Sequence, residues 1–179
     1  MDIIIIGRVG EDGILELVSR HEEEIASEYS GRYISEGIRD LSAEFADDDC
    51  MKMLNAYGAD AYVVGRQGIF GALYKMGQAA GTGMRITLMD LPISQFTIEM
   101  ADRYDENPYM LSSLGCILVC AANGNSLADR LNDAGYPARI IGYTTDDNAC
   151  IAVTNSGETY LSARRLKSND TQGKDSSEY

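Results

Sequence analysis

Residues 60–86 read DAYVVGRQGIFGALYKMGQAAGTGMRI, and this stretch decides the predicted fold. It opens with a short apolar segment that is typical of a strand, and a glycine turn at 65–68 follows. Apolar side chains then recur at helical spacing, at Ile69, Leu73 and Met76. The helix should end near Gly81, and MRITLM (residues 84–89) should form a second strand that ends before Pro92. We therefore expect a strand, a turn, a helix and a strand in succession.

The turn at 65–68 has two interpretations. Backbone N–H groups at the start of a helix carry partial positive charge and bind anions, and Arg66 would add a full charge. On this interpretation Arg66, Gln67 and Gly68 form a ligand-binding turn. On the other, the glycines only permit a tight change of direction. The turn itself contains no carboxylate and no hydroxyl group.

Helix-like and strand-like segments alternate along the rest of the chain. Residues 2–6 and the doubly apolar GCILVCAA (115–122) should be strands, the latter central in a sheet. Residues 11–29 should form a helix capped by Asp12, and a second helix should carry Ile34, Ile38, Leu41 and Phe45. PARIIGY and ACIAVT should be strands, with a hairpin turn at TNSGET. This order predicts an α+β fold, an α/β sandwich in which helices pack on a mixed sheet.

One domain is expected over residues 1–166, followed by a polar tail at 167–179 that composition predicts to be disordered. The net charge of −13 argues against nucleic acid and anionic membranes as partners. No apolar run approaches the roughly 20 residues that span a bilayer. We expect a cytoplasmic protein, whose four cysteines are reduced thiols.

Metal and cofactor sites are not expected. Cys116 and Cys120 would lie roughly 13 Å apart on one strand, too far for a shared metal or a disulfide. His21 is the one histidine, and it is either a catalytic base or a packed boundary residue. The acidic run Asp47, Asp48 and Asp49 either ligates a hard cation or caps the helix that follows it.

Three stretches carry a family resemblance: DIIIIGRVGEDGILEL (2–17), GIFGALYKMGQAAGTGMRITLMDLPIS (68–94) and NPYMLSSLGCILVCAANGNSLADRLNDAGYPARIIGYTT (107–145). In order and spacing they resemble the C-terminal domain of the aminoimidazole ribonucleotide (AIR) synthase superfamily, in its hydrogenase-maturation-factor-like branch. The resemblance covers residues 2–166. It implies a three-layer α/β domain that, in full enzymes, sits beside an N-terminal domain that binds ATP and magnesium. The half that carries most nucleotide and metal ligands would then lie outside this chain.

The resemblance also allows the turn to be compared with the motif of the family. Family members usually have His-Asp-x-Ser/Thr-Glu-Gly-Gly where this chain has YVVGRQG, residues 62–68. Val63, Gly65 and Arg66 thus replace an acid, a hydroxyl and a second acid, so the polar chemistry of the motif is lost. The Ser-x-Gly motif adds Ser113 and Gly115 as candidate ligand residues, and the Leu114 between them stands where a small hydroxyl residue is common.

Two functional hypotheses follow from these residues. The first is a stand-alone, catalytically degenerate domain that acts in binding, regulation or assembly and is not an enzyme as an isolated chain. The alternative is the C-terminal half of a split ATP-dependent enzyme of the AIR synthase or hydrogenase-maturation type, whose ATP-binding domain is a separate chain. The expected partner is a second copy of the chain or that separate ATP-binding protein.

Overall fold

The computed structural model describes residues 1–39, 41 and 45–161. The strands are β1 (Asp2–Ile6), β2 (Asp60–Val63), β3 (Gly83–Thr87), β4 (Ile117–Ala121), β5 (Ala138–Thr145), β6 (Cys150–Thr154) and β7 (Gly157–Tyr160). The α-helices are α1 (Glu11–Arg20), α2 (Glu22–Glu28), α3 (Gly31–Arg39), α4 (Asp48–Tyr57), α5 (Gly68–Ala80), α6 (Gln95–Arg103) and α7 (Gly124–Asp133). The predicted tail at 167–179 lies outside the described residues, and so does the end of the predicted domain, 1–166.

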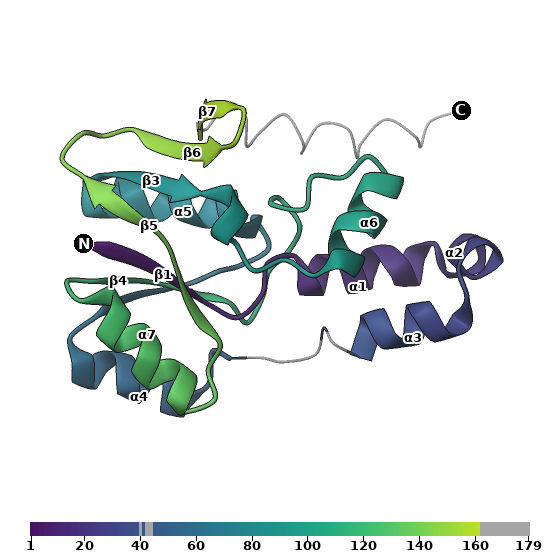
Figure 1. Cartoon of the computed structure of the whole chain (residues 1–179), viewed down its shortest axis with the longest axis horizontal. Coiled ribbons are helices and arrows are strands. Elements are labelled where there is room, and N and C mark those ends of the chain that lie inside the picture. Colours follow the sequence, from purple (N-terminus) through teal and green to yellow (C-terminus); the bar gives the residue numbers. More distant parts are fainter. Residues whose placement is uncertain (40, 42–44, 162–179) are drawn as a thin grey trace, which may run out of the picture.

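A single mixed sheet organises these elements (Figure 1). Its strand order is β2-β4-β1-β5-β3-β6-β7, and β2 is an edge strand. Neighbouring strands are antiparallel except β3 and β6, which are parallel. The predicted interior position of the 115–122 strand is confirmed, because β4 has a partner on each side and is buried along its length.

Helices cover both faces of the sheet, because successive strand side chains point to opposite faces. Ile3 and Ile5 of β1 pack with α5, whereas Ile4 and Ile6 pack with α4 and α7 on the other face. All four isoleucines are fully buried, and each stabilises the fold by about 2 kcal/mol. The predicted α+β sandwich is confirmed.

A second group of helices lies beside the sheet (Figure 1). Helices α1, α2, α3 and α6 enclose their own apolar cluster, which includes Ile14, Ile25 and Met100. Helix α1 follows β1 after only a short loop, so this group is held close to the end of β1. The loops that join the helix group to the sheet position the candidate site described below.

Two of the predicted helices differ from the observed ones. Residues 11–29 form two helices, because the backbone of His21 (φ −117°, ψ 25°) breaks the run between α1 and α2. Asp12 does not cap α1; Gly10 precedes the helix, and the Asp12 carboxylate accepts a 2.5 Å hydrogen bond from Ser112 Oγ. The helix through Ile34 ends at Arg39, and Phe45 packs instead with the cluster under β1.

Other boundaries follow the sequence more closely. The strand predicted over 84–89 ends at Thr87, because the chain turns into a short 3₁₀ helix, η1 (Leu88–Asp90). Helix α5 ends as predicted at Gly81, which adopts a left-handed conformation (φ +63°). The hairpin at TNSGET is confirmed by the pairing of Thr154 with Gly157 between β6 and β7.

Candidate functional site

The glycine turn at 65–68 packs closely against a distant loop. Gly68 begins α5 with φ +67°, and its N–H donates to the Gly65 carbonyl at 3.3 Å. A Cβ atom on Gly68 would lie 2.6 Å from the carbonyl carbon of Met110 and 2.7 Å from the carbonyl oxygen of Tyr109. Both are backbone atoms that cannot move aside, so only glycine fits at this position.

Backbone hydrogen bonds join the two predicted site segments. The Ser113 N–H donates to the Gly65 carbonyl at 3.4 Å, and the Val64 N–H donates to the Cys116 carbonyl at 2.9 Å. The Phe70 N–H completes the contact by donating to Tyr109 O at 3.2 Å. Residues 64–70 and 109–116 therefore lie side by side, although residues 71–108 separate them in the sequence.

Ser113 and Gly115 belong to the framework of this turn. Ser113 is buried, and its hydroxyl accepts from the Gly10 N–H at 2.9 Å and donates to the Leu111 carbonyl at 3.0 Å. Gly115 is also buried, with φ +87°, and its carbonyl accepts from the Phe45 N–H at 3.4 Å. A ligand role for Ser113 and Gly115 remains a prediction, and the hydrogen bonds of the serine hydroxyl are already used within the protein.

A cleft of about 230 Å³ opens between the turn, α1 and the 106–112 loop. Arg66 lines it, with a side chain that is 76% exposed and 3.5 Å from the Glu16 carboxylate. Arg20 and Glu106 also line it, and neither makes an ion pair within the described part of the chain. Gln67 does not line the cleft, because its side chain folds back against Gly65 and Gly71. Of the three predicted turn residues, only Arg66 faces the cleft.

The sequence gives no hint of a buried acid behind the turn. Glu11, the first residue of α1, is only 8% exposed, and its Oε1 has no hydrogen-bond partner within the described residues. Burial raises the pKa of this carboxyl to about 7, and Arg8, whose Nη1 lies 3.7 Å away, lowers it in part. The Cys116 thiol donates to the Arg8 carbonyl, and burial, with the Glu11 charge, raises its pKa to about 12.

Two apolar side chains are exposed on the edge of the sheet beside the turn. Val63, the last residue of β2, is 50% exposed, and Leu114 is 47% exposed. Residues on either side of Leu114 bond to Gly65 and Val64, so Val63 and Leu114 lie on adjacent segments. We call Val63, Leu114 and Arg66 the edge patch.

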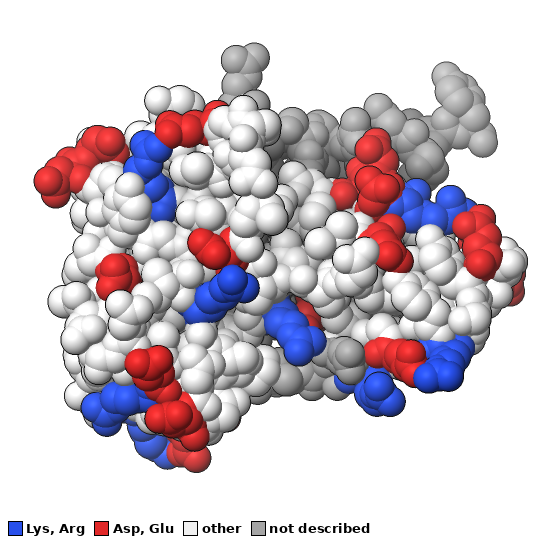
Figure 2. All heavy atoms as spheres, in the orientation of Figure 1, with Lys and Arg blue, Asp and Glu red and all other residues white. Residues whose placement is uncertain are grey.

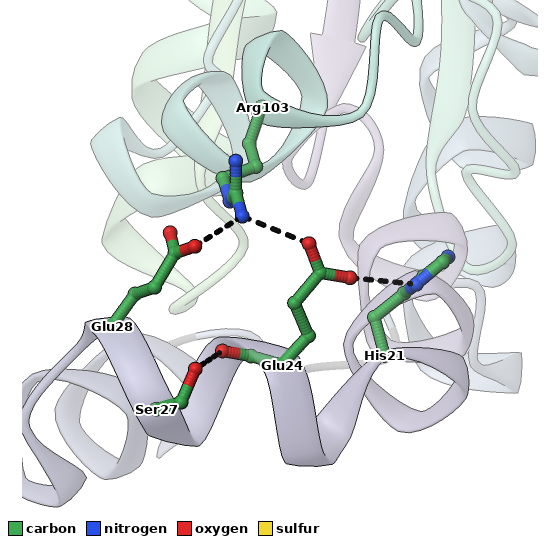
Figure 3. A network of polar contacts seen from close by, with 5 residues as sticks. All are labelled: His21, Glu24, Ser27, Glu28 and Arg103. Carbon is green, nitrogen blue, oxygen red and sulfur yellow. Dashed lines mark hydrogen bonds and ion pairs between the residues drawn. The ribbon is translucent and has the colours of Figure 1, made fainter.

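His21 occupies a packed boundary position. Its ring stacks on Tyr104 at 4.1 Å, and its Nδ1 lies 3.6 Å from the Glu24 carboxylate. Figure 3 shows Arg103 of α6 binding both Glu24 and Glu28 of α2, at 2.8 and 2.5 Å. The contacts of His21 thus belong to the network that joins α6 to α2. They support packing over catalysis as its role.

The acidic run at 47–49 caps a helix. Asp47 accepts from the Cys50 N–H at 2.8 Å at the start of α4, and Asp49 pairs with Lys52. Hydrogen bonds from the Cys50 backbone and Tyr136 hold the pKa of Asp47 below its usual value. Within residues 1–39, 41 and 45–161, no three potential metal-ligating side chains gather at one place.

Surface charge is mixed on the face shown in Figure 2, where acidic and basic side chains alternate over both the sheet and the helix group. This view shows no continuous basic area of the kind that binds nucleic acid. Among the described residues, no helix is both long and apolar enough to cross a membrane.

Comparison with solved structures identifies the architecture. The chain superposes on HypE in a HypE–HypF complex with a TM-score of 0.72 at 17% identity, covering 90% of this chain and 52% of that one. The chain has the AIR synthase-related fold. E. coli HypE gives a TM-score of 0.72 at 16% identity, with 90% of this chain and 49% of that one covered.

Thiamine-monophosphate kinase from Stenotrophomonas maltophilia K279a shares the AIR synthase-related fold, with a TM-score of 0.61 at 18% identity over 87% of this chain and 50% of that one. The chain therefore spans about half the length of the solved proteins that it resembles. No family model matches the sequence, and no curated protein does so either. At these identities the likeness concerns the fold alone.

Proposed function

We propose that this chain is a catalytically degenerate domain of AIR synthase-related fold that acts in binding or assembly through its edge patch. The backbone of the turn remains tightly built, with Gly68 seated against Met110. Val63, Gly65 and Arg66, however, stand where the resembled family has an acid, a hydroxyl and an acid. A valine cannot position a metal or a proton, and an arginine reverses the charge of the acid that it replaces.

The exposure of Val63 and Leu114 is the observation that carries this proposal. Both are about half exposed, on adjacent segments, at positions where the family favours polar residues. Exposed apolar side chains are typical of the core of a protein interface, in which arginine is also enriched. Strand β2 adds a sheet edge, whose outer side has no strand partner in the part of the chain that the structure describes. The occupant that we favour is a second copy of this chain.

Replacing Val63 by Asp and Leu114 by Ser should abolish self-association. Both side chains are exposed, so the free energy of unfolding should change by no more than about 0.5 kcal/mol for each. Light scattering over a wide concentration range measures the first effect and urea unfolding the second. The matched control is Ile98→Ser on α6, which removes an equally exposed apolar side chain, 45% exposed, away from the patch.

Three results would contradict the proposal. The first is a wild-type chain that stays monomeric at every concentration, and the second is a variant that associates as the wild type does. The third is micromolar binding of ATP with magnesium to the isolated chain in isothermal titration, because a degenerate turn should not hold that ligand.

Arg66→Glu is expected to abolish binding by the edge patch and to leave the melting temperature nearly unchanged. Arg66 is mostly exposed, and its ion pair with Glu16 at 3.5 Å contributes about 0.5 kcal/mol or less. A partner copy is acidic overall, with a net charge of −13, so a glutamate at 66 would repel it. Arg32→Glu, which removes an exposed ion pair with Glu36 on α3, is the control for light scattering and thermal unfolding. A large loss of stability in Arg66→Glu alone would show that this arginine is structural.

A second candidate function is the C-terminal half of a split enzyme. The extent of the superpositions favours this candidate. Nearly all of this chain superposes on each solved neighbour, but it covers only about half of that neighbour's length. HypE has been solved in complex with ATP and in complex with HypF. This candidate requires a separately encoded ATP-binding domain that co-purifies with the chain and restores ATP turnover when the two are mixed. A genome without such a gene would exclude it in this form.

We propose a cytoplasmic location for this protein. All four cysteines are buried free thiols, in keeping with a reducing compartment.

A further inference from the structure

A second hollow, of about 310 Å³, lies at the far end of α5 from the turn. Because α5 has 13 residues, the two ends are separated by roughly 20 Å. The side chains that give the hollow its chemistry are Tyr74, Gln78, Thr82, Asn148, Cys150 and Leu161. We call it the amide pocket, after its two carboxamides.

The backbone fixes the walls of the amide pocket. The Thr82 N–H donates to the Gly77 carbonyl at 3.2 Å, which holds the end of α5 against the start of β3. On the opposite wall, the Leu161 N–H donates to the Cys150 carbonyl at 2.8 Å. The lining thus comes from the end of α5, the loop before β6, β6 itself and the end of β7.

Within residues 1–39, 41 and 45–161, no charged side chain lines the amide pocket, although charged residues make up 24% of the chain. Burial raises the pKa of the Cys150 thiol to about 11, so this group is also neutral near neutral pH. A phosphate or a carboxylate would lose its hydration here and gain no counter-charge. The lining therefore selects an uncharged ligand.

Polar groups with spare hydrogen-bonding capacity face apolar ones in the amide pocket. Gln78 Nε2 donates to Tyr74 Oη at 3.0 Å, which leaves the Gln78 carbonyl oxygen as an acceptor. The Asn148 side chain makes no hydrogen bond to any described residue, and Thr82 Oγ1 is buried without a partner among them. Cys150, Leu161 and the Tyr74 ring supply apolar surface. Carboxamides pair best with a flat edge that offers both a donor and an acceptor.

We propose that the amide pocket binds a neutral heterocycle with a lactam edge, in which an N–H lies beside a C=O. Its volume is at the lower end of the range for small-molecule sites and admits one small ring system. The site is independent of the edge patch, because it lies on other residues at the other end of α5.

Uracil is the probe, and orotate is its matched control, since orotate is the same ring with an added carboxylate. Ligand-observed NMR on the full chain should show binding of uracil and at least tenfold weaker binding of orotate. Asn148→Leu should weaken uracil binding at least tenfold, the effect of one lost hydrogen-bonding pair. Asn155→Leu, an exposed asparagine in the β6–β7 turn, should bind uracil as the wild type does.

Asn148 is exposed, so the Asn148→Leu variant should fold. Its thermal unfolding, compared with that of the wild type, checks that it does. Thr82→Val, which keeps the shape of the side chain and removes the hydroxyl, tests the opposite wall. Uracil that does not bind at millimolar concentration would overturn the proposal. Orotate that binds as well as uracil would overturn it too, as would an Asn148→Leu chain that binds like the wild type.

Discussion

Gly68→Ala is expected to destabilise the protein by about 3 kcal/mol, whereas Gly81→Ala, at the other end of the same helix, should cost about 1 kcal/mol. Both glycines are left-handed, with φ of +67° and +63°, so alanine is strained at either position. They differ in their surroundings. A Cβ at Gly68 meets the backbone of Tyr109 and Met110 at 2.6–2.7 Å, and a Cβ at Gly81 meets nothing within 4 Å.

The difference between the two variants therefore measures the packing of the turn against the 109–110 loop. Urea unfolding gives both free energies, and equal m-values would show that the two variants unfold to the same extent. Equal losses for Gly68→Ala and Gly81→Ala would mean that the turn is strained but not tightly packed. In that case the framework around the edge patch would be looser than the structure indicates.

The parts of the fold that the sequence predicted correctly are those with strong local signals. Helix α5 is one, because its apolar period is regular and a glycine stands at each end. Strand β4 is another, because an apolar run on both faces fits only a covered position in a sheet. In both cases the local preference and the tertiary environment agree.

The errors arise where tertiary contacts override the local pattern. The period of 11–29 continues across His21, yet the helix breaks there, where the ring stacks on Tyr104 more than eighty residues away. Phe45 keeps helical spacing with Ile38 but packs near Gly7, in another cluster. Neither contact partner can be inferred from the spacing of the residues alone.

The candidate site was predictable only in part, for the same reason. Arg66 is recognisable because it is a charge in a glycine turn. Its neighbours in the cleft, Glu16, Arg20 and Glu106, come from α1 and a remote loop. The turn motif predicts Gln67 as a ligand residue. In the structure its side chain packs over Gly65 and Gly71 instead, a contact that the motif does not indicate. Glu11 gave no signal, because an acid in the first turn of a helix is normally a solvated one.

Glu11 should make the protein less stable as the pH rises from about 4.5 to 7. The pKa of this carboxyl is raised from 4.5 to about 7 in the folded state, because burial disfavours its charge. Below pH 4.5 both states hold the proton. Between the two pKa values the unfolded state releases a proton that the folded state keeps, so the free energy of unfolding falls, by about 3 kcal/mol in total.

Glu11→Gln removes this titration and keeps the size of the side chain. The variant should match the wild type near pH 4 and exceed its stability by about 3 kcal/mol near pH 8, measured by urea unfolding at each pH. Other titrating groups contribute equally to both chains, so they cancel in the difference. Glu16→Gln, an exposed carboxylate on the same helix, should show a nearly constant difference of about 0.5 kcal/mol or less.

A Glu11→Gln difference that stays constant from pH 4 to pH 8 would mean that Glu11 titrates alike in the folded and unfolded chains. A variant that is less stable than the wild type at pH 8 would mean that the Arg8 guanidinium, 3.7 Å away, outweighs the burial. The expected sign rests on the buried Oε1, which lacks a hydrogen-bond partner within the described residues, where the Arg8 guanidinium at 3.7 Å is its ion-pair partner. For such a carboxylate, the desolvation cost of burial exceeds the free energy gained from the ion pair with Arg8.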